Sequence, residues 1–342
     1  MRFDFSKDLP NIPSISALSR LLDQPTETLY WLANARSLRN HGDSRHYNSW
    51  WIRKRSGGWR LVESPKSRLK EVQRQLLAQI FDRIPPHALA FGFCKGRNVV
   101  DFVKPHVGQQ ACLKIDLADF FTHVTTGRVW GLLRKAGYNR EVAHLIALLT
   151  TVRTSQRLLS IEHPNSAFTI RQPELRRRHL PQGAPTSPAI ANLCAFGLDV
   201  RLSGLARRYG AHYTRYADDI VISGDHELER QAHRLKIVAG TIALEEGFAV
   251  NFRKTKLMRS SQRQIATGVV LNERLNITRS NYDSLKATLF NCAQHGPQSQ
   301  NRDAHPFFRE HLNGRIMWVE QLNAIKGKKL RELFERIQWS SE

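Results

Sequence analysis

An acidic pair inside an apolar, β-branched run constrains this chain more than any other stretch. Asp218 and Asp219 stand at the centre of segment 213–223 (YTRYADDIVIS). The β-branched and aromatic residues on both sides favour two short strands. Because successive side chains of a strand point to opposite faces, two adjacent carboxylates can address one site only from a turn. We therefore predict a β-hairpin with an acidic tip, a position where Asp is locally favoured.

A tip of this kind suits hard divalent cations. Mg²⁺ prefers a few carboxylate oxygens together with water and substrate phosphates, and a two-ion site generally takes carboxylates from more than one segment. Segment 113–121 (LKIDLADFF) supplies Asp116 after apolar residues, at an expected strand end, whereas Asp119 is expected to have turned away. Paired acidic residues also occur by chance in surface turns that bind nothing, so the pair alone does not identify a metal site.

A loop rich in Gly and Pro lies between the two acidic segments. It occupies residues 180–192 (LPQGAPTSPAIAN) and runs into a stretch that we expect to be helical. The three segments follow one another in the order of a polymerase palm. Jointly they resemble reverse transcriptases, in particular the retron-type branch, from about residue 47 to about residue 272. The residues that look like motifs A, B and C of that family are Asp116 with Phe121, Gln182 and Gly183 with Ser187 and Pro188, and Tyr216, Ala217, Asp218 and Asp219.

The charge of the chain indicates a polyanionic partner. The 342 residues include 52 Lys and Arg against 30 Asp and Glu, which gives a net charge of +22. Anionic membranes are the rival polyanion, but the sequence has no run of about 18 apolar residues. We therefore expect nucleic acid as the partner and no membrane association.

Compartment and cysteine chemistry follow from two further observations. The N-terminus has no apolar stretch of signal-peptide length, so we expect a cytoplasmic protein. The four cysteines show no Cys-x-x-Cys spacing, which argues against a zinc ribbon or a disulfide framework and favours reduced, mostly buried thiols. They are Cys94, Cys112, Cys194 and Cys292.

The first hundred residues are predicted to form two short helices, a basic hairpin and an amphipathic helix. The helices fall within residues 13–42, with Ser14 and Thr26 as caps, and a packing layer is favoured over a DNA-reading helix-turn-helix. Segment 50–63 is the hairpin and 65–84 the longer helix. The hairpin resembles the reverse transcriptase fingers, although its charges could also serve only solvation. Its expected triphosphate ligands are Arg53, Lys54 and Arg60.

The family resemblance assigns roles to several other side chains. Phe121 corresponds to the steric gate that occupies the space of a ribonucleotide 2′-hydroxyl, with a plain core phenylalanine as the alternative. Gln182 belongs to a loop that touches the nascent base pair. Lys254, on an expected edge strand over 248–255, resembles the motif D lysine that acts on the leaving pyrophosphate; a solvated lysine is the alternative. Segment 174–179 is solvated or contacts phosphates through Arg176, Arg177 and Arg178.

Two segments compare with signatures of retron enzymes. His106 stands at the His of an Asn-Ala-x-x-His signature, and taken alone it is expected to be a structural hydrogen-bonding residue. Segment 265–272 is an expected hairpin that matches a Val-Thr-Gly signature, and the resemblance makes Thr267 and Gly268 part of a primer grip. The departures from the two signatures are Phe102, Val103 and Ala266.

The C-terminal part, from about residue 280, is predicted to be a helical thumb. Cations interleave with aromatic residues there, as nucleic-acid tracking favours, and the expected contacts are Arg315, Lys328 and Lys329. We expect no RNase H, endonuclease or maturase-like extension. The predicted fold is an α/β (α+β) right hand whose palm is built on an antiparallel sheet. Its expected domains are 1–110 (N-terminal helices and fingers), 111–275 (palm, with a helical insertion at about 124–180) and 276–342 (thumb).

The resemblance implies RNA-templated DNA synthesis with two Mg²⁺ ions held by Asp116, Asp218 and Asp219. The implied partners are dNTPs, a structured noncoding RNA that serves as template and primer, its DNA product, and an effector protein of an antiphage defence operon. A group II intron-like or diversity-generating enzyme shares the palm and stays an alternative. A catalytically idle scaffold that only binds RNA is the alternative from another class, and dNTP incorporation on primed RNA discriminates it.

Overall fold

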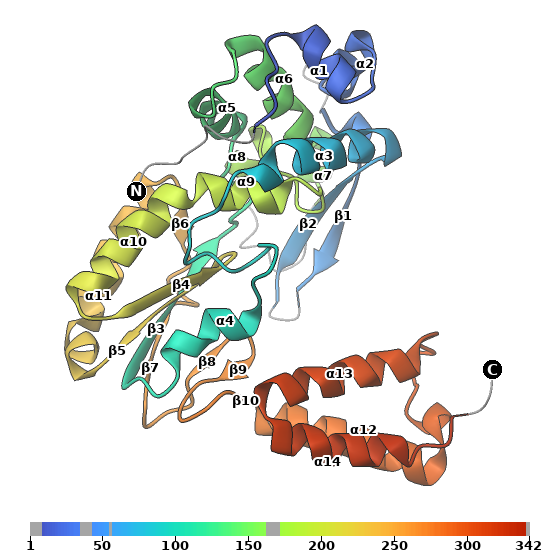
Figure 1. Cartoon of the computed structure of the whole chain (residues 1–342), viewed down its shortest axis with the longest axis vertical. Coiled ribbons are helices and arrows are strands. Elements are labelled where there is room, and N and C mark those ends of the chain that lie inside the picture. The colour runs from blue at the N-terminus through green and yellow to red at the C-terminus, as the bar shows by residue number, and fades with distance from the viewer. Residues whose placement is uncertain (1–8, 35–42, 55–56, 162–171, 340–342) are drawn as a thin grey trace.

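An antiparallel sheet lies at the centre of the computed structural model, which describes residues 9–34, 43–54, 57–161 and 172–339 (Figure 1). The strand β3 is hydrogen-bonded to β5 on one side and to β6 and β7 on the other, and β4 adds to the outer edge of β5. All these pairings are antiparallel. The strand bounds are β3 (Ala111–Ala118), β4 (His212–Tyr216), β5 (Asp219–Gly224), β6 (Ala249–Val250) and β7 (Lys256–Arg259). The predicted combination of helices with an antiparallel sheet is confirmed.

The two faces of the sheet differ because side chains alternate along each strand. Ile115 of β3 and Ile220 of β5 are fully or almost fully buried and point to the face covered by two helices. Asp116, one residue further along β3, therefore points to the opposite face. The covering helices are α10 (Phe196–Arg208) and α11 (His226–Glu245), and α9 (Ser187–Cys194) precedes them.

The N-terminal part contains the predicted helices and hairpin. Ser14 caps the first helix by accepting from Ala17 N at 3.2 Å, as expected. The cap predicted at Thr26 is wrong: Pro25 occupies the cap position and Thr26 is the first helical residue. Residues 35–42, and Ser56 of the hairpin turn, lie outside the described part. The elements are α1 (Ile15–Leu21), α2 (Thr26–Leu32), β1 (Tyr47–Arg53), β2 (Trp59–Pro65), α3 (Ser67–Gln79) and α4 (Val99–Val103).

A helical layer lies between β3 and α9 in the chain. Its helices are α5 (Thr126–Lys135), α6 (Arg140–Thr150), α7 (Gln156–Leu159) and α8 (Gln172–Arg176). The first three lie in the range 124–160, where the sequence pattern is helical, and α8 lies in the polar segment that follows it. Val129 of α5 and Ile146 of α6 share one large apolar core with α1, α2 and α3, whereas Leu159 of α7 and Leu175 of α8 pack with Leu61 of β2 in a separate small cluster. In Figure 1 this layer, α1 and α2 lie at one end of the molecule.

A second core joins the C-terminal helices to a small sheet. Leu289 of α12 and Ile316 of α13 are buried there together with Val269 of β9. Figure 1 shows the three helices side by side, at the end opposite to α1. The elements are β8 (Ile265–Ala266), β9 (Val269–Val270), β10 (Asn276–Ile277), α12 (Arg279–His295), α13 (Phe308–Leu322) and α14 (Ala324–Glu335). The predicted helical C-terminal part and the hairpin over 265–272 are confirmed as secondary structure.

None of the helices that the structure describes has by itself the length and apolar character needed to cross a bilayer, and only the bent pair α9 and α10 meets both criteria jointly.

Candidate active site

The register of three strands brings the acidic residues together. Asp116 of β3 lies directly opposite Asp219 of β5, and Asp219 lies opposite Tyr216 of β4. Residues directly opposite each other in an antiparallel pair share a face of the sheet, so the Asp116 and Asp219 side chains are neighbours. The connection between β4 and β5 has two residues, Ala217 and Asp218, and Ala217 is in the left-handed region at φ 55°. The predicted acidic hairpin is confirmed, with Asp218 in the turn and Asp219 as the first strand residue.

Two lysines pair with this cluster. Lys114 Nζ lies 2.9 Å from Asp219 Oδ1, and Lys254 Nζ lies 3.3 Å from Asp116 Oδ2. Sequence reasoning missed Lys114, although its place two residues before Asp116 puts it on the same face of β3. The two contacts partly offset the repulsion among the carboxylates.

The segment that carries Lys254 differs from its prediction as an edge strand over 248–255. Only Ala249–Val250 forms a strand, at the sheet edge. The chain then turns, and the backbone N–H groups of Lys254 and Thr255 both donate to Asn251 O, at 3.1 and 3.0 Å. Because β6 and β7 on either side of this turn both pair with β3, the turn lies over β3 and the Lys254 amine reaches Asp116.

The electrostatics of the tip centre on Asp218. Desolvation raises the pKa of its carboxyl, and the nearby carboxylates of Asp219 and Asp116 raise it further. A positive charge beside the carboxyl would lower its pKa and so counteract both effects. The carboxyl is thus held in surroundings that favour a cation beside it.

The carboxylates offer the oxygen donors that a divalent ion prefers, but they do not surround an ion by themselves. Among the described residues, no three His, Cys, Asp or Glu side chains form a group that could hold a metal by themselves. Mg²⁺ does not need such a cage, because it retains waters and is commonly held by one or two carboxylates plus substrate phosphates. The hard oxygen donors of Asp116, Asp218 and Asp219 fit that manner of binding.

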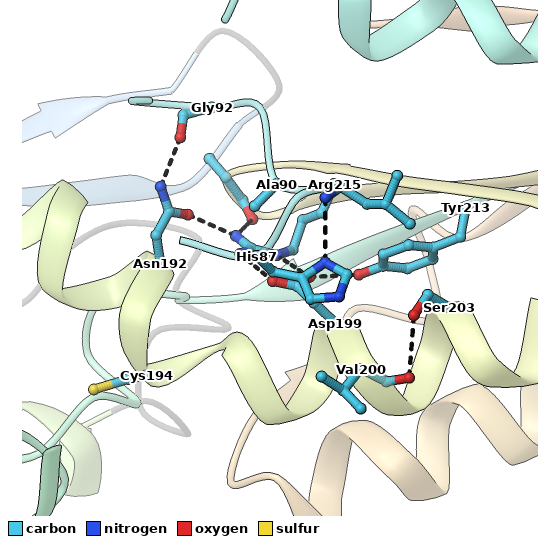
Figure 2. Close-up of polar contacts among 12 residues, drawn as sticks. His87, Ala90, Gly92, Asn192, Cys194, Asp199, Val200, Ser203, Tyr213 and Arg215 are labelled. Atoms are coloured by element: carbon cyan, nitrogen blue, oxygen red, sulfur yellow. Dashed lines mark hydrogen bonds and ion pairs between the residues drawn. The ribbon is translucent and has the colours of Figure 1, made fainter. Parts of the chain in front are cut away.

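A buried ion pair lies directly behind the tip. Arg215 and Asp199 are both fully buried, and Arg215 Nε and Nη2 each donate to an Asp199 carboxylate oxygen at 2.7 Å (Figure 2). Tyr213 Oη donates to Asp199 at 2.6 Å. Arg215 Nη1 donates to Ala217 O at 3.0 Å and to Asn192 Oδ1 at 2.9 Å. Sequence reasoning missed this network, since Arg215 alternates with Tyr216 and so faces α10 instead of the acidic cluster.

The two phenylalanines after β3 take different environments. Phe120 is buried, and its ring stacks on Phe248 with centroids 5.4 Å apart. Phe121 is half-buried, on the side of Tyr216 and the exposed Phe93, whose ring centroid lies 6.2 Å away. The two adjacent rings thus differ in burial and in their aromatic neighbours.

His106 makes the structural contacts expected of it. It is fully buried, with Nδ1 2.6 Å from Ser223 Oγ and Nε2 2.7 Å from Thr214 Oγ1. Burial, with a smaller contribution from the nearby His212, lowers the pKa of the imidazole to about 3. The ring is therefore neutral in the folded protein at ordinary pH.

The buried His106 predicts a pH dependence of stability. The unfolded chain protonates this residue below a pKa of about 6.5, whereas the folded chain does so only near 3. Stability is thus fully present above pH 6.5 and falls as the pH drops toward 3, at up to about 1.4 kcal/mol per pH unit. The free energy of unfolding, measured by urea denaturation between pH 4 and 7, should depend less steeply on pH in His106→Gln than in the wild type. His144→Gln, at an exposed position of α6, should keep the wild-type slope; equal slopes for all three proteins would contradict the assignment.

The loop before α9 docks on the N-terminal hairpin. Glu63 N of β2 donates to Gln182 O at 2.9 Å. Gly183 has φ 133°, and a Cβ there would lie 3.2 Å from Glu63 O, so the close approach requires glycine. Arg53 and Arg60 are exposed on the same hairpin, and Lys54 follows β1. The hairpin and the loop thus pack together as one unit.

The three arginines of segment 176–178 divide into two environments. Arg176 and Arg177 are exposed. Arg178 Nη2 instead donates to the carbonyls of Ala33, Leu148 and Thr151 at 3.0 to 3.2 Å. A guanidinium satisfied by interior carbonyls is not available for phosphates, so the prediction that Arg178 contacts nucleic acid is corrected to a structural role.

The remaining predicted residues lie in the second core region. Thr267 and Gly268 form the turn between β8 and β9, both in the left-handed region, at φ 45° and 85°. Lys328 and Lys329 are exposed on α14, and Arg315 is half-buried on α13, where burial lowers its pKa. The structure places these residues on elements distinct from the acidic hairpin.

The sequence matches the family model described as reverse transcriptase (RNA-dependent DNA polymerase) over residues 52–284. That range contains the acidic hairpin, β3 and the loop before α9. Two relatives come from Myxococcus xanthus: the retron Mx65 reverse transcriptase, 41% identical over 84% of this chain, and the retron Mx162 reverse transcriptase, 34% identical over 94%. The retron Ec86 reverse transcriptase of Escherichia coli is 29% identical over 81% of the chain and 75% of its own length.

The chain spans 64% and 66% of the length of the two Myxococcus relatives. The family match covers the greater part of the chain and includes the strands that bring Asp116, Asp218 and Asp219 together. The chain therefore belongs to the reverse transcriptase (RNA-dependent DNA polymerase) family and is of the retron type.

Proposed function

We propose that this protein is an RNA-directed DNA polymerase. The observation that carries the proposal is the register that sets Asp116 opposite Asp219, with Asp218 in the adjoining two-residue turn. Family membership supports the same reaction. A primer hydroxyl attacks the α-phosphorus of a dNTP, a new phosphodiester bond forms, and pyrophosphate leaves.

Asp116, Asp218 and Asp219 are the proposed ligands of two Mg²⁺ ions. When bound, such ions supply Lewis acidity that stabilises charge on the attacking and leaving oxygens. Lys114 and Lys254 hold two of the three carboxylates in place. Lys254 is half-exposed and can turn from Asp116 toward the phosphates of a nucleotide, which supports its proposed contact with the leaving group.

The remaining proposed roles follow the arrangement of elements around this face. Arg53, Lys54 and Arg60 of the hairpin contact the triphosphate, Gln182 the nascent base pair, and Phe121 the nucleotide sugar. Exposed basic side chains, the half-buried Arg315 and the β8–β9 turn contact nucleic acid: Arg176, Arg177, Thr267, Gly268, Arg315, Lys328 and Lys329. The proposed domains are 1–110 for the fingers, 111–275 for the palm and 276–342 for the thumb.

The proposed template and primer is a structured noncoding RNA. The net charge of +22 and the likeness to three relatives named retron reverse transcriptases support this partner. The proposed product is a branched RNA–DNA hybrid, and the proposed biological setting is a retron defence system with an effector protein.

Primer extension tests the polymerase proposal. The purified protein, Mg²⁺ and dNTPs are expected to extend a DNA primer annealed to an RNA template, and omission of Mg²⁺ in the presence of EDTA should stop the reaction. RNA binding without any incorporation would favour an idle RNA-binding scaffold. Sequencing the nucleic acid that copurifies with the protein then tests whether a structured RNA is the template.

Two double variants are expected to show that the hairpin binds the nucleotide and the C-terminal helices bind RNA. Each phosphate contact in single-stranded nucleic acid contributes about 0.7 to the slope of log affinity against log salt. Replacing Lys328 and Lys329 with Ala should therefore reduce the magnitude of this slope for RNA by roughly one unit and leave the KM for dNTP unchanged. Replacing Arg53 and Lys54 with Ala should raise the KM and leave the slope unchanged. The reverse pattern would show that the two elements are assigned to the wrong ligands.

A further inference from the structure

Phe93 combines two features that are seldom found together. Its side chain is 52% exposed, and its backbone is in the left-handed region at φ 60°. A bulky residue adopts that region only at a cost in free energy, and such outliers cluster at functional sites where the surroundings enforce them. Phe93 lies in none of the motifs to which a function was assigned above.

The Phe93 ring completes an aromatic group beside the acidic cluster. Its centroid lies 6.2 Å from that of Phe121 and 6.5 Å from that of Tyr216, with interplanar angles of 45° and 42°. Phe121 also contacts Phe120, whose centroid is 5.7 Å away. The Phe121 ring therefore has the buried Phe120 on one side and the exposed Phe93 on another. These separations fall in the range of favourable aromatic pairs.

The backbone around Phe93 is held by the buried network behind the tip. Asn192 Nδ2 donates to Gly92 O at 2.7 Å, and Arg215 Nη1 donates to the Asn192 side-chain oxygen, as Figure 2 shows. A Cβ on Gly92 would lie 2.5 Å from Ala217 N, so only glycine permits this approach. The same two side chains, Asn192 and Arg215, thus hold the backbones of two left-handed residues, Phe93 and Ala217.

We propose that Phe93 is a positioning residue for nucleotide sugar discrimination, acting as a buttress that keeps the Phe121 ring in place. The proposal rests on the proposed function, in which Phe121 excludes the ribonucleotide 2′-hydroxyl. Phe121 is half-buried, so Phe120 alone leaves part of the ring unsupported. Without Phe93 the ring gains room to swing away from the sugar, and a ribonucleotide fits more readily. Phe93 is exposed and its backbone is strained, so packing of the core does not account for its conformation. Substrate selection does.

The test is a double-variant cycle on the ratio of kcat/KM for dNTP to kcat/KM for the matching rNTP, on primed RNA. Phe93→Ala is expected to lower this ratio by about 2- to 10-fold, the range for one aromatic pair. Phe121→Ala should lower it further. The Phe93→Ala/Phe121→Ala double variant should match Phe121→Ala alone, because a buttress has no effect once the ring is gone. Phe93→Tyr, which keeps an aromatic ring at this position, should have the wild-type ratio.

A control variant and two outcomes test this inference, and a different outcome would contradict the proposed function. Phe252 is similarly exposed, but its ring lies against Gly240 of α11, and Phe252→Ala should leave the ratio unchanged. An unchanged ratio in Phe93→Ala, in a protein where Phe121→Ala lowers it, overturns the inference. Effects that multiply in the double variant also overturn it, because Phe93 would then act independently of Phe121. A wild-type protein without any incorporation would instead overturn the proposed function itself.

Discussion

Asp116→Asn and Asp218→Asn are each expected to reduce nucleotide incorporation by about a thousandfold or more. A metal ligand contributes several kcal/mol of transition-state stabilisation, and each 1.36 kcal/mol is a factor of ten in rate. Folding should change little, since Asp218 is exposed in the turn and Asn at the buried Asp116 preserves the shape of the side chain. Single-turnover primer extension measures the rate, and thermal unfolding and RNA binding at fixed salt serve as checks.

The third carboxylate and a remote one provide comparisons for this experiment. Asp219→Asn is expected to have a smaller effect, because Asp219 is paired with Lys114 at 2.9 Å and serves the ions less directly. Asp82→Asn, at an exposed position far from the sheet in sequence, should retain full activity. If Asp116→Asn or Asp218→Asn keeps activity within a few-fold of wild type, the assignment of the metal ligands is wrong.

Arg215→Met is expected to destabilise the fold by about 3 to 5 kcal/mol, the cost of leaving one partner of a buried ion pair uncompensated. Asp199 is fully buried and also accepts from Tyr213, so of the side-chain donors described above its carboxylate would keep only the Tyr213 hydroxyl. Chemical denaturation at constant pH measures the loss. Arg201→Met is the matched control on the same helix as Asp199, because Arg201 pairs with Glu245 and Glu246 at the surface. Such exposed ion pairs contribute little to the free energy of unfolding.

A double variant separates the ion pair from packing. Arg215→Met/Asp199→Leu removes both charges, so it should be more stable than Arg215→Met alone. Its nucleotide incorporation should nevertheless be lower than that of the wild type, because the hydrogen bonds from Arg215 to Ala217 O and Asn192 are gone. Recovery of both stability and activity would show that Arg215 does not position the tip.

The local pattern of the sequence was sufficient for the elements that carry the chemistry. Alternation and turn preferences act over a few residues, and they correctly predicted the hairpin around Asp218, the hairpin over 265–272 and the helix after Gln182. The same patterns were less informative where contacts decide the conformation. The strand expected over 248–255 shortened to two residues, because Asn251 O organises a turn that brings Lys254 over β3.

By itself the sequence determined the acidic residues, their order along the chain and the hairpin that carries two of them, since these follow from local periodicity and residue chemistry. The right-hand fold was implied by the resemblance of the three motifs to reverse transcriptases. Only the tertiary structure decided what the charged side chains touch. Arg178 proved to donate to backbone carbonyls, Lys114 proved to pair with Asp219, and Arg215 proved to be buried against Asp199. The reason is physical: such pairings join residues from different segments, and their geometry depends on strand register and helix packing, which no local stretch encodes.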